Sequence, residues 1–422
     1  MNQKDPSKKH PEASEDKFFT APLVIIFVTI FIDLIGFGMV IPILPFYASS
    51  AEFRASPFEI GMLFSIYSWM QFFFSPILGR LSDRYGRRPI LFISLLGSAV
   101  GYFLIGLAGT LTMVFIGRII GGITGGNIAT AQAYIADVTT RENRAKGMGL
   151  FGAAFGLGFI FGPALAGILS KFGIHVPFYF AAALSLVNAI ALYFVLPESL
   201  KPDIRARQAE RKGKIAEIVE SLTDPSIRMI SIIYFLLITA FSIMTYAFVL
   251  FTAFRFGYDA EQNGYLFAYV GLMAIIMQGA VFGMAAKRFG EARLAVLGCL
   301  VLTGSLFVFP YTGPNFYGLA GLLIVSAFLS FGNAFASPAL SSLASKNAGD
   351  HEQGRVMGLM QSGASLARAI GPTIGGVLLN NSLNNVDNHT VFRTFWTASA
   401  IMFFAFLMAA YFWRSMRAAD VI

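Results

Sequence analysis

Residues 79–88 read Gly-Arg-Leu-Ser-Asp-Arg-Tyr-Gly-Arg-Arg, a dense group of charges between two long apolar stretches. The stretch 59–78 comes before this group and the stretch 89–109 follows it. Because a charged side chain is costly at the centre of a bilayer, these charges must lie at a membrane face. The segment therefore predicts a tight loop that joins two membrane-spanning helices.

The composition is that of a membrane protein. The chain has 422 residues, of which 56% are hydrophobic and 13% charged, and its mean hydropathy is +0.67. A soluble domain usually carries about 25% charged residues, so most of the surface is expected to face lipid. The single cysteine, Cys299, excludes an intrachain disulfide and a cysteine-based metal site. Residues 1–20 are polar, so we expect the first apolar stretch to stay as an anchor rather than to be cleaved.

The apolar stretches have the length of membrane-spanning helices. A helix needs about 20 apolar residues to cross a bilayer, and lipid offers no partners to backbone groups, which favours helices. The stretches do not alternate as the strands of a membrane barrel do. The sequence therefore predicts an all-α membrane protein with twelve transmembrane helices, at residues 22–46, 59–80, 89–109, 112–136, 146–170, 176–196, 229–254, 262–286, 293–310, 316–340, 353–378 and 391–413.

Lysine and arginine residues predict the orientation, because they gather in cytoplasmic loops. The loops of one side carry only Arg54, Lys171, Arg255 and Arg393. The other side carries many more, so we expect both termini in the cytoplasm. The net charge of +8 is thereby spread over short loops, which argues against nucleic acid as a partner. The residues of this basic side include Lys4, Lys8, Lys9, Lys17, Arg80, Arg84, Arg87, Arg88, Arg141, Arg144, Lys146, Arg205, Arg207, Arg211 and Lys212.

Residues 197–228 divide the apolar pattern into two sets of six spans. Apolar residues recur at helical spacing within this charged stretch, at Ile215, Ile218, Val219 and Leu222. They predict a short amphipathic helix on the cytoplasmic surface, either a solvated linker or a regulatory element. We expect an N-terminal tail at 1–21, a six-helix half at 22–196, the linker at 197–228, a second half at 229–413 and a C-terminal tail at 414–422.

The two sets of spans share an internal repeat. Four residues recur 204 positions later: Gly79, Leu81, Tyr85 and Gly86 match Gly283, Ala285, Phe289 and Gly290. Five more recur 209 positions later: Lys146, Gly149, Gly162, Pro163 and Gly167 match Arg355, Gly358, Gly371, Pro372 and Gly376. Repeated halves around a central site are typical of secondary transporters. The sequence therefore predicts two pseudo-symmetric six-helix halves and a transporter.

Several motifs resemble those of one family. The pattern Gly-x-Leu-x-Asp-Arg-x-Gly-Arg-Arg at 79–88 resembles the loop between helices 2 and 3 of major facilitator superfamily transporters. Arg118 opens Gly-Arg-Ile-Ile-Gly-Gly-Ile-Thr-Gly-Gly-Asn, which resembles the fourth-helix motif of that family. The segment Gly156–Leu169 resembles its fifth-helix antiporter signature, and Asp33–Pro45 is similar to the first-helix signature of drug:proton antiporters.

The resemblance covers about residues 22–413 and is greatest to drug:proton antiporters of the tetracycline and multidrug efflux type, especially over Ile119–Thr139. It departs in one respect. That group has further acidic residues in spans 3 and 9, whereas this chain has Gly101 at the expected place in span 3 and none in span 9. The departure argues against tetracycline itself as the substrate and for a simple proton stoichiometry.

The resemblance implies a proton-coupled secondary transporter of the major facilitator fold. It implies export of amphipathic small molecules, as in antibiotic resistance, by rocker-switch alternating access. We expect a monomer in the bacterial inner membrane, with protons, substrate and lipids as its partners. A lipid or glycolipid flippase on the same fold is the alternative. A receptor or membrane enzyme is disfavoured because no catalytic constellation is present. No cofactor is expected, since the sequence has neither a phosphate-binding Gly-x-x-x-x-Gly-Lys-Ser/Thr nor zinc-ligand spacing.

Three charged residues lie well inside the predicted spans: Asp33, Arg118 and Arg368. Asp33 is a candidate for proton or cation coupling, for structural pairing, or for direct contact with substrate. Arg118 always keeps its charge, so it would act on a neighbouring carboxyl or only pair structurally. Arg368 would line the cavity, where it could bind an anionic group or pair with Asp33, or else only pack or reach the interface.

The remaining site residues fall into three predicted groups. Polar and aromatic residues at cavity depth are Asn127, Gln132, Tyr134, Tyr246, Asn333 and Gln361, with Trp69 as a further candidate. The predicted cytoplasmic gate comprises Gly79, Asp83, Arg84, Gly86, Arg87 and Arg88, whose arginines would pair with Asp137 or Glu142. Asp83 would meet the end of span 11, and the resemblance implies that the cluster stabilises the outward-open state, although its arginines also set topology.

The fifth span carries the antiporter-type group, which is Gly158, Gly162, Pro163 and Gly167. A proline removes one helix hydrogen bond and kinks the helix, and small residues allow helix backbones to approach closely. This span is therefore expected to form a surface on which the two halves rock. Static packing is the alternative role of its glycines.

Overall fold

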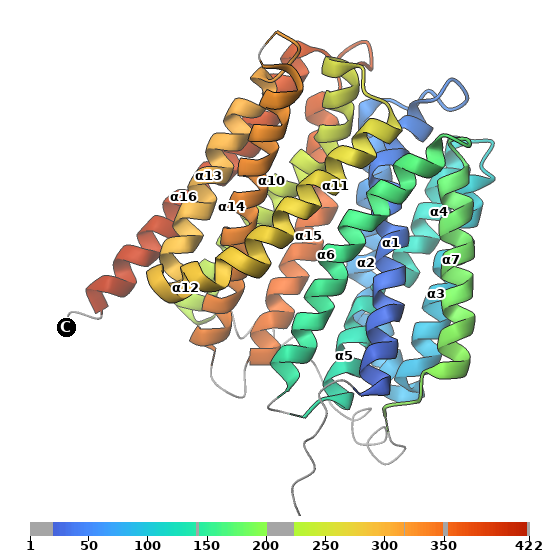
Figure 1. Ribbon diagram of the computed structural model, residues 1–422, viewed down its shortest axis with the longest axis vertical. Helices are drawn as coiled ribbons and strands as arrows, with labels where there is room; N and C mark the ends of the chain where they lie inside the picture. Colours follow the sequence, from blue (N-terminus) through green and yellow to red (C-terminus); the bar gives the residue numbers. More distant parts are fainter. Residues whose placement is uncertain (1–19, 141–142, 201–222, 316, 349–352, 420–422) are drawn as a thin grey trace, which may run out of the picture.

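The computed structural model describes residues 20–140, 143–200, 223–315, 317–348 and 353–419. Over these residues the chain forms one bundle of long helices that lie side by side (Figure 1). Eleven helical segments are long and apolar enough to cross a membrane. A twelfth, α15 (Gln353–Leu379), packs against α2 and α10 within the bundle. The prediction of twelve helices is confirmed.

The first six spans are formed by helices of the N-terminal half. The fourth span is interrupted by a short 3-10 segment, η1, which the sequence did not predict. In chain order the elements are α1 (Ala21–Ser49), α2 (Pro57–Tyr85), α3 (Arg87–Gly106), α4 (Leu111–Thr124), η1 (Gly125–Asn127), α5 (Ile128–Val138), α6 (Arg144–Ser170) and α7 (Val176–Val195).

The second six spans have the same order. Here the second span of the half is interrupted by a π-helical segment, η3, and the third ends in a 3-10 turn, η4. The elements are α10 (Pro225–Phe256), α11 (Ala260–Ile276), η3 (Met277–Phe282), α12 (Gly283–Phe289), α13 (Glu291–Val308), η4 (Phe309–Tyr311), α14 (Gly318–Asn347), α15 and α16 (Asn388–Ala419).

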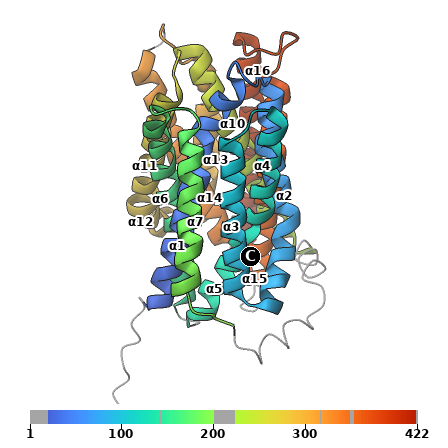
Figure 2. The same ribbon diagram turned by 90° about the vertical axis from the view of Figure 1, so that its right-hand side faces the viewer.

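The packing follows a pseudo-two-fold pattern. In the first half α1 packs against α6 and α7, and α3 packs against α4 and α7. Helices α3 and α7 lie side by side in Figure 2. In the second half α10 packs against α15 and α16, and α13 packs against α14 and α16. The halves meet along two further pairs, α2 with α15 and α6 with α11. These two pairs are themselves equivalent under the repeat.

The helix ends form two faces. One face carries the charged segment 79–88, the start of α1 and the end of α16 (Figure 1), and is called the motif face below. The opposite face carries the connections α1–α2, α6–α7, α10–α11 and α15–α16. Two helices begin at the opposite face with a capping box, Ser56 with Glu59 on α2 and Asp259 with Gln262 on α11. Such boxes satisfy backbone donors that a helix start leaves free.

The charged segment 79–88 is not a loop, which corrects the expectation from its charge. Helix α2 continues through Tyr85 and α3 begins at Arg87, so Gly86 alone joins them, with φ 108° and ψ 156°. In the repeat, Gly290 alone joins α12 to α13, with φ 79° and ψ 152°. Positive φ values of this kind are favourable only for glycine. The charges instead extend the helix beyond the apolar layer, where its backbone bonds remain intact.

Some predictions concern residues that the structure does not describe. The linker helix with Ile215, Ile218, Val219 and Leu222 lies at 201–222, outside the described residues. The same holds for residues 1–19 and 420–422 of the two tails. It also holds for Glu142, one of the partners predicted for the gate.

Candidate functional site

A cavity of about 530 Å³ lies between the two halves. Its walls come from α1, α2, α3, α4, η1, α5 and α6 of the first half and from α10, α11, η3, η4, α14 and α15 of the second. This volume is within the range of about 300–1,000 Å³ that is usual for small-molecule sites. Most of the lining is apolar, with a few charged and amide side chains among aromatic rings.

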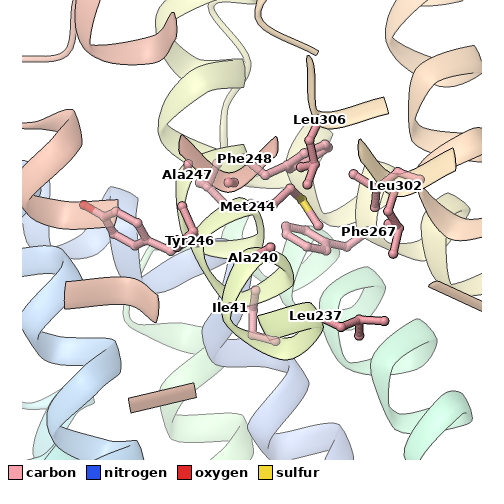
Figure 3. Close-up of a cluster of buried hydrophobic side chains, with 14 of the residues drawn as sticks. Ile41, Leu237, Ala240, Met244, Tyr246, Ala247, Phe248, Phe267, Leu302 and Leu306 are labelled. Carbon is pink, nitrogen blue, oxygen red and sulfur yellow. The ribbon is translucent and has the colours of Figure 1, made fainter. Parts of the chain in front are cut away.

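An apolar cluster closes the cavity toward the opposite face. Helix α10 contributes Met244 and Phe248, which pack with Ile41 of α1 and Phe267 of α11 (Figure 3). All four side chains are buried and also line the cavity. The cluster therefore separates the cavity from the opposite face.

Polar contacts between the halves reinforce this closure. Thr373 of α15 donates a hydrogen bond of 2.8 Å to the Ser65 hydroxyl of α2. The Tyr246 hydroxyl of α10 donates to the carbonyl of Pro57. Lys171, just after α6, forms an ion pair of 2.8 Å with Glu261 of α11.

Close backbone contact between α6 and α11 occurs at glycines. A Cβ atom placed on Gly264 would lie 2.6 Å from the Pro163 carbonyl oxygen and 2.9 Å from the Cα of Gly167. A Cβ on Gly167 would lie 2.9 Å from the carbonyl oxygen of Glu261. Because real Cβ atoms do not approach so closely, only glycine permits this crossing of the two halves.

Toward the motif face the two halves separate. A Cβ added to Gly152 of α6, Gly279 of η3 or Gly363 of α15 would meet no atom within 4 Å. The cavity lining extends in this direction through Leu91 and Phe151. Over the residues that the structure describes, the cavity is therefore open on the motif side and closed on the opposite side.

Asp33 faces this cavity from the middle of α1. Its Oδ2 accepts a hydrogen bond of 3.2 Å from Nδ2 of Asn127. No lysine or arginine among the described residues forms an ion pair with it. The alternative of structural pairing with an arginine is therefore not observed among the described residues in this state. Asp33 is held by a neutral partner.

The interruption of the fourth span positions Asn127. Residues Gly125–Asn127 form η1, and Gln71 of α2 donates a hydrogen bond of 2.8 Å to the Gly125 carbonyl. A Cβ on Gly125 would lie 2.3 Å from the Tyr67 hydroxyl. Only glycine therefore lets η1 approach α2, and this approach brings Asn127 to Asp33.

Arg118 lies on α4 and is almost fully buried, with an exposed fraction of 3%. Its Nε donates a hydrogen bond of 3.0 Å to the Leu63 carbonyl. Its guanidinium lies over the ring of Tyr67, 4.3 Å from the centroid, an arrangement that is attractive for a cation. Arg118 thus lines the same cavity as Asp33, and among the described residues no ion pair joins the two.

Arg368 enters the cavity from α15 on the other half. Its only hydrogen bond within the described residues runs from Nη2 to the Ser365 hydroxyl, at 3.2 Å. It forms no ion pair with Asp33 there. On the adjacent helix α14, the Ser326 hydroxyl and the Asn333 side-chain oxygen are buried without a partner, and both residues line the cavity.

The structure brings together most of the predicted site residues. Seven of them line the cavity: Asp33, Arg118, Asn127, Tyr246, Asn333, Gln361 and Arg368. Gln132 and Tyr134 do not, because α5 turns them elsewhere, and the fully buried Tyr134 donates its hydroxyl to the Pro197 carbonyl at 2.9 Å. Trp69 also lies outside the lining and stacks on Phe73.

Several lining residues were missed. Tyr67 and Gln71 of α2 and Gln278 of η3 face the cavity. Tyr67 and Gln71 are four residues apart, which places them on one face of a helix. That spacing in an otherwise apolar span was the signal that could have found them.

Arg87 is the centre of the predicted gate. It forms ion pairs with Asp83, at 2.6 Å, and with Asp137 of α5, at 3.2 Å. Arg84 and Arg88 do not pair with Asp137 among the described residues, although all three arginines were predicted to pair with Asp137 or Glu142. Arg84 lies over the ring of Tyr85 instead.

A further acidic residue, Glu198, completes this cluster. Its carboxylate accepts hydrogen bonds from the backbone amides of Arg87, at 2.9 Å, and Arg88, at 3.2 Å. These amides are the first of α3, and negative charge at a helix start is stabilising. Arg88 also donates to the Tyr193 carbonyl. The sequence offered the signal of an acidic residue directly after the sixth span, and it was overlooked.

The antiporter-type glycines of α6 serve two contacts. A Cβ on Gly158 would lie 2.6 Å from Cβ of Leu34, and one on Gly162 would lie 2.8 Å from Cα of Gly38. Both therefore pack α6 against α1 within the first half. Of the four motif residues, Gly167 and the carbonyl of Pro163 are the ones that closely approach glycines or backbone of the second half. Elsewhere on α6, Ile160 and Phe159 meet Gly271 of α11.

Comparison with known proteins agrees with this architecture. The family model described as "Major Facilitator Superfamily" matches residues 26–372 and 279–421. The class H tetracycline resistance protein of Pasteurella multocida is 32% identical over 399 residues, covering 92% of this chain and 95% of the relative. Multidrug resistance protein 2 of Bacillus subtilis (strain 168) is 31% identical, covering 86% of this chain and 89% of the relative.

Solved structures share the fold at lower identity. The human organic anion transporter MFSD10 (TETRAN) has a TM-score of 0.68 at 24% identity, with 92% of this chain and 99% of that chain covered. The nucleoside transporter NupG has a TM-score of 0.72 at 15% identity, with the same coverage of both chains. This chain is a multi-pass membrane transporter related to tetracycline and multidrug efflux proteins, and it belongs to the Major Facilitator Superfamily.

Proposed function

We propose that this protein is a proton-coupled antiporter that exports amphipathic small molecules by rocker-switch alternating access. The proposal rests chiefly on Asp33, whose carboxyl faces a central cavity and, among the described residues, is bound only by the neutral amide of Asn127. A carboxyl without a cationic partner can gain and lose a proton without breaking an ion pair. This is the property that a proton carrier in a membrane requires.

The described state fits one end of such a cycle. With both termini in the cytoplasm, as the loop charges predict, the motif face is cytoplasmic and the cavity is open inward. Export then requires the contacts of the opposite face to break, including that of Thr373 with Ser65 and that of Lys171 with Glu261. The halves 22–196 and 229–413 would tilt as two bodies about the α6–α11 and α2–α15 contacts.

Proton entry can supply the necessary free energy. A membrane potential contributes about 2.3 kcal/mol per charge per 100 mV, and each pH unit contributes about 1.4 kcal/mol. One proton per cycle at Asp33 would therefore drive export against a gradient of ten-fold or more under ordinary conditions.

The test is gradient-driven transport in proteoliposomes. An imposed pH gradient should drive uptake of an amphipathic dye such as ethidium by the wild type, and Asp33→Asn should abolish it. Asp387→Asn, which removes a carboxylate on the opposite face, is the matched control and should transport normally. Undiminished uptake by Asp33→Asn would reject Asp33 as the carrier.

A lipid or glycolipid flippase remains the second candidate. Arg368, with a single hydrogen bond in an aromatic cavity, would suit an anionic headgroup. This function predicts headgroup-dependent thermal stabilisation of the purified protein and no response to ethidium. If ethidium stabilises the protein against heat and lipids do not, the flippase function is rejected.

A further inference from the structure

Building on the proposed antiport, we infer that the substrate is an amphipathic zwitterion that bridges the two halves. Its anionic group binds Arg368 of α15, and its cationic group binds Asp33 of α1. The inference deepens the proposed function by naming a substrate class. It rests on the arrangement of charge in the cavity.

Arg368 is the available cation of the cavity. A guanidinium has five N–H donors, and within the described part of the chain Arg368 makes a single hydrogen bond, to the Ser365 hydroxyl. The residue is partly exposed and lines the cavity. The partnerless Ser326 hydroxyl on the adjacent α14 adds a buried polar group on the same side. The guanidinium of Arg368 favours a carboxylate or sulfonate as its ligand, because such a group can accept hydrogen bonds from two N–H donors at once.

Arg118 does not compete for this role. It is buried, its Nε is bonded to the Leu63 carbonyl and its guanidinium lies over Tyr67. A ligand anion would have to displace these contacts. The difference between the two arginines therefore assigns the anionic group to the second half.

Asp33 supplies the opposite charge on the first half. It accepts one hydrogen bond, from Asn127, and has no cationic partner among the described residues. Asp33, Tyr67, Arg118 and Arg368 all line the same cavity, and the guanidinium of Arg118 lies over the Tyr67 ring. One small molecule can therefore reach both Asp33 and Arg368.

The requirement for exchange explains why one charge is insufficient. In an antiporter the proton and the substrate must exclude each other. An anion at Arg368 alone would make the cavity more negative and would attract a proton to Asp33, which favours co-transport. A substrate that also places a cation on Asp33 competes directly with the proton. A zwitterion thus provides an acceptor for the N–H donors of Arg368 and also prevents the proton and the substrate from binding at Asp33 together.

The rest of the lining selects an aromatic or otherwise apolar body. Phe37 and Phe64 of the first half and Phe241 of the second line the same cavity. Offset or edge-to-face contacts with such rings are favourable. The cavity volume of 530 Å³ is ample for a two-ring molecule with two charged groups.

The experiment uses four probes on one naphthalene scaffold, measured by calorimetry on the full-length protein in nanodiscs at pH 7.5. The probes are 3-(2-naphthyl)alanine as the zwitterion, 2-naphthoate as the anion, 2-naphthylmethylamine as the cation and 2-naphthamide as the neutral control. The wild type should bind the zwitterion about ten-fold or more tightly than the neutral amide, because both charged contacts are made. Equal affinities, or no binding of the zwitterion, would overturn the inference.

Two cavity variants separate the two contacts. Arg368→Gln should weaken the zwitterion and the anion about ten-fold or more and leave the cation unchanged. Asp33→Asn should weaken the zwitterion and the cation and spare the anion. Arg293→Gln removes an exposed arginine outside the cavity and should change none of the affinities.

The outcomes distinguish the inference from the proposed function. Wild-type affinity of Arg368→Gln for both the zwitterion and the anion would overturn the inference, even if pH-driven transport is observed. Conversely, the expected binding pattern without any pH-driven transport would reject the antiport while the two charged contacts stand. Should Arg368→Gln fail to fold, Arg368→Lys supplies the second test, because it keeps the charge but loses two-donor binding and should weaken the anion only in part.

Discussion

Lys346 at the end of α14 forms an ion pair with Glu291 at the start of α13, at the positions where the first half pairs Asp137 with Arg87. The basic and acidic residues have exchanged places between the halves. In each half the pair joins the helix that follows the single-glycine connection to the end of the neighbouring span. The repeat has therefore kept the ion pair and not the sign of its charges.

The two pairs should differ in their contribution to stability, because they differ in burial. The Arg87 side chain is 5% exposed, whereas that of Lys346 is 62% exposed. Arg87→Gln should lower the free energy of unfolding by about 3 kcal/mol, since it removes a buried cation that pairs with both Asp83 and Asp137. Lys346→Gln should lower it by about 0.5 kcal/mol or less. Unfolding of both variants in the same detergent measures the difference.

A charge exchange provides the control for the Arg87 pair. The double variant Arg87→Glu with Asp137→Lys copies the polarity of the second half and should recover part of the stability that Arg87→Glu alone loses. If the double variant loses more free energy of unfolding than the two single variants lose together, the interaction between residues 87 and 137 is not attractive.

Gly264 should control closure of the opposite face. Gly264→Ile places a side chain against the Pro163 carbonyl and the Cα of Gly167, so α6 and α11 should separate. Spin labels at Phe172 and Leu383, both 76% exposed and on different halves, should then report a longer distance. Gly304→Ile, at a glycine with no neighbour within 4 Å, is the matched control and should leave the distance unchanged.

Gly125 should control the position of Asn127 relative to Asp33. Gly125→Ala brings a Cβ to 2.3 Å from the Tyr67 hydroxyl, which should displace η1 and weaken the Asn127–Asp33 hydrogen bond. We expect gradient-driven transport to fall about ten-fold, because one hydrogen bond to a charged group is worth roughly that much. Adding Tyr67→Phe removes the clashing oxygen and should restore part of the activity. No rescue would locate the defect elsewhere.

Asp387 should make the start of α16 sensitive to acid. The backbone amide of Thr390 donates to its carboxylate and holds the pKa of Asp387 below its ordinary value of 3.8. Because the folded pKa is the lower one, the stabilisation is complete above the ordinary pKa and is lost as the pH falls through the lowered value. Asp387→Asn keeps an acceptor oxygen but does not ionise. The difference in melting temperature between wild type and Asp387→Asn should be constant from pH 7 to about pH 5 and shrink in stronger acid; a constant difference down to pH 2.5 would contradict this assignment.

The sequence was sufficient for the architecture because membrane spans are specified by length and apolarity alone. The repeat of Gly86 at Gly290 and of Pro163 at Pro372 then indicated two halves. It was not sufficient for the local breaks. Nothing in the apolar pattern of residues 112–136 distinguishes a continuous helix from one interrupted at η1, since that break depends on the fit of Gly125 against Tyr67.

The candidate site was predictable where a residue was chemically out of place. Asp33 and Arg368 are charges in apolar spans, and both line the cavity. Tyr134 was misplaced because an aromatic residue in a span is equally compatible with a cavity and with a buried contact, and its partner, the Pro197 carbonyl, lies in a distant segment. Side-chain direction on α5 is decided by tertiary packing.

Gly86 and Gly290 each join two long helices without any intervening residue. An insertion at either glycine would rotate the following helix about its own axis and turn its apolar side away from its neighbours. Fusion partners, epitope tags and added loops should consequently be harmful at these two junctions. Natural variants of this chain should change length at other helix connections.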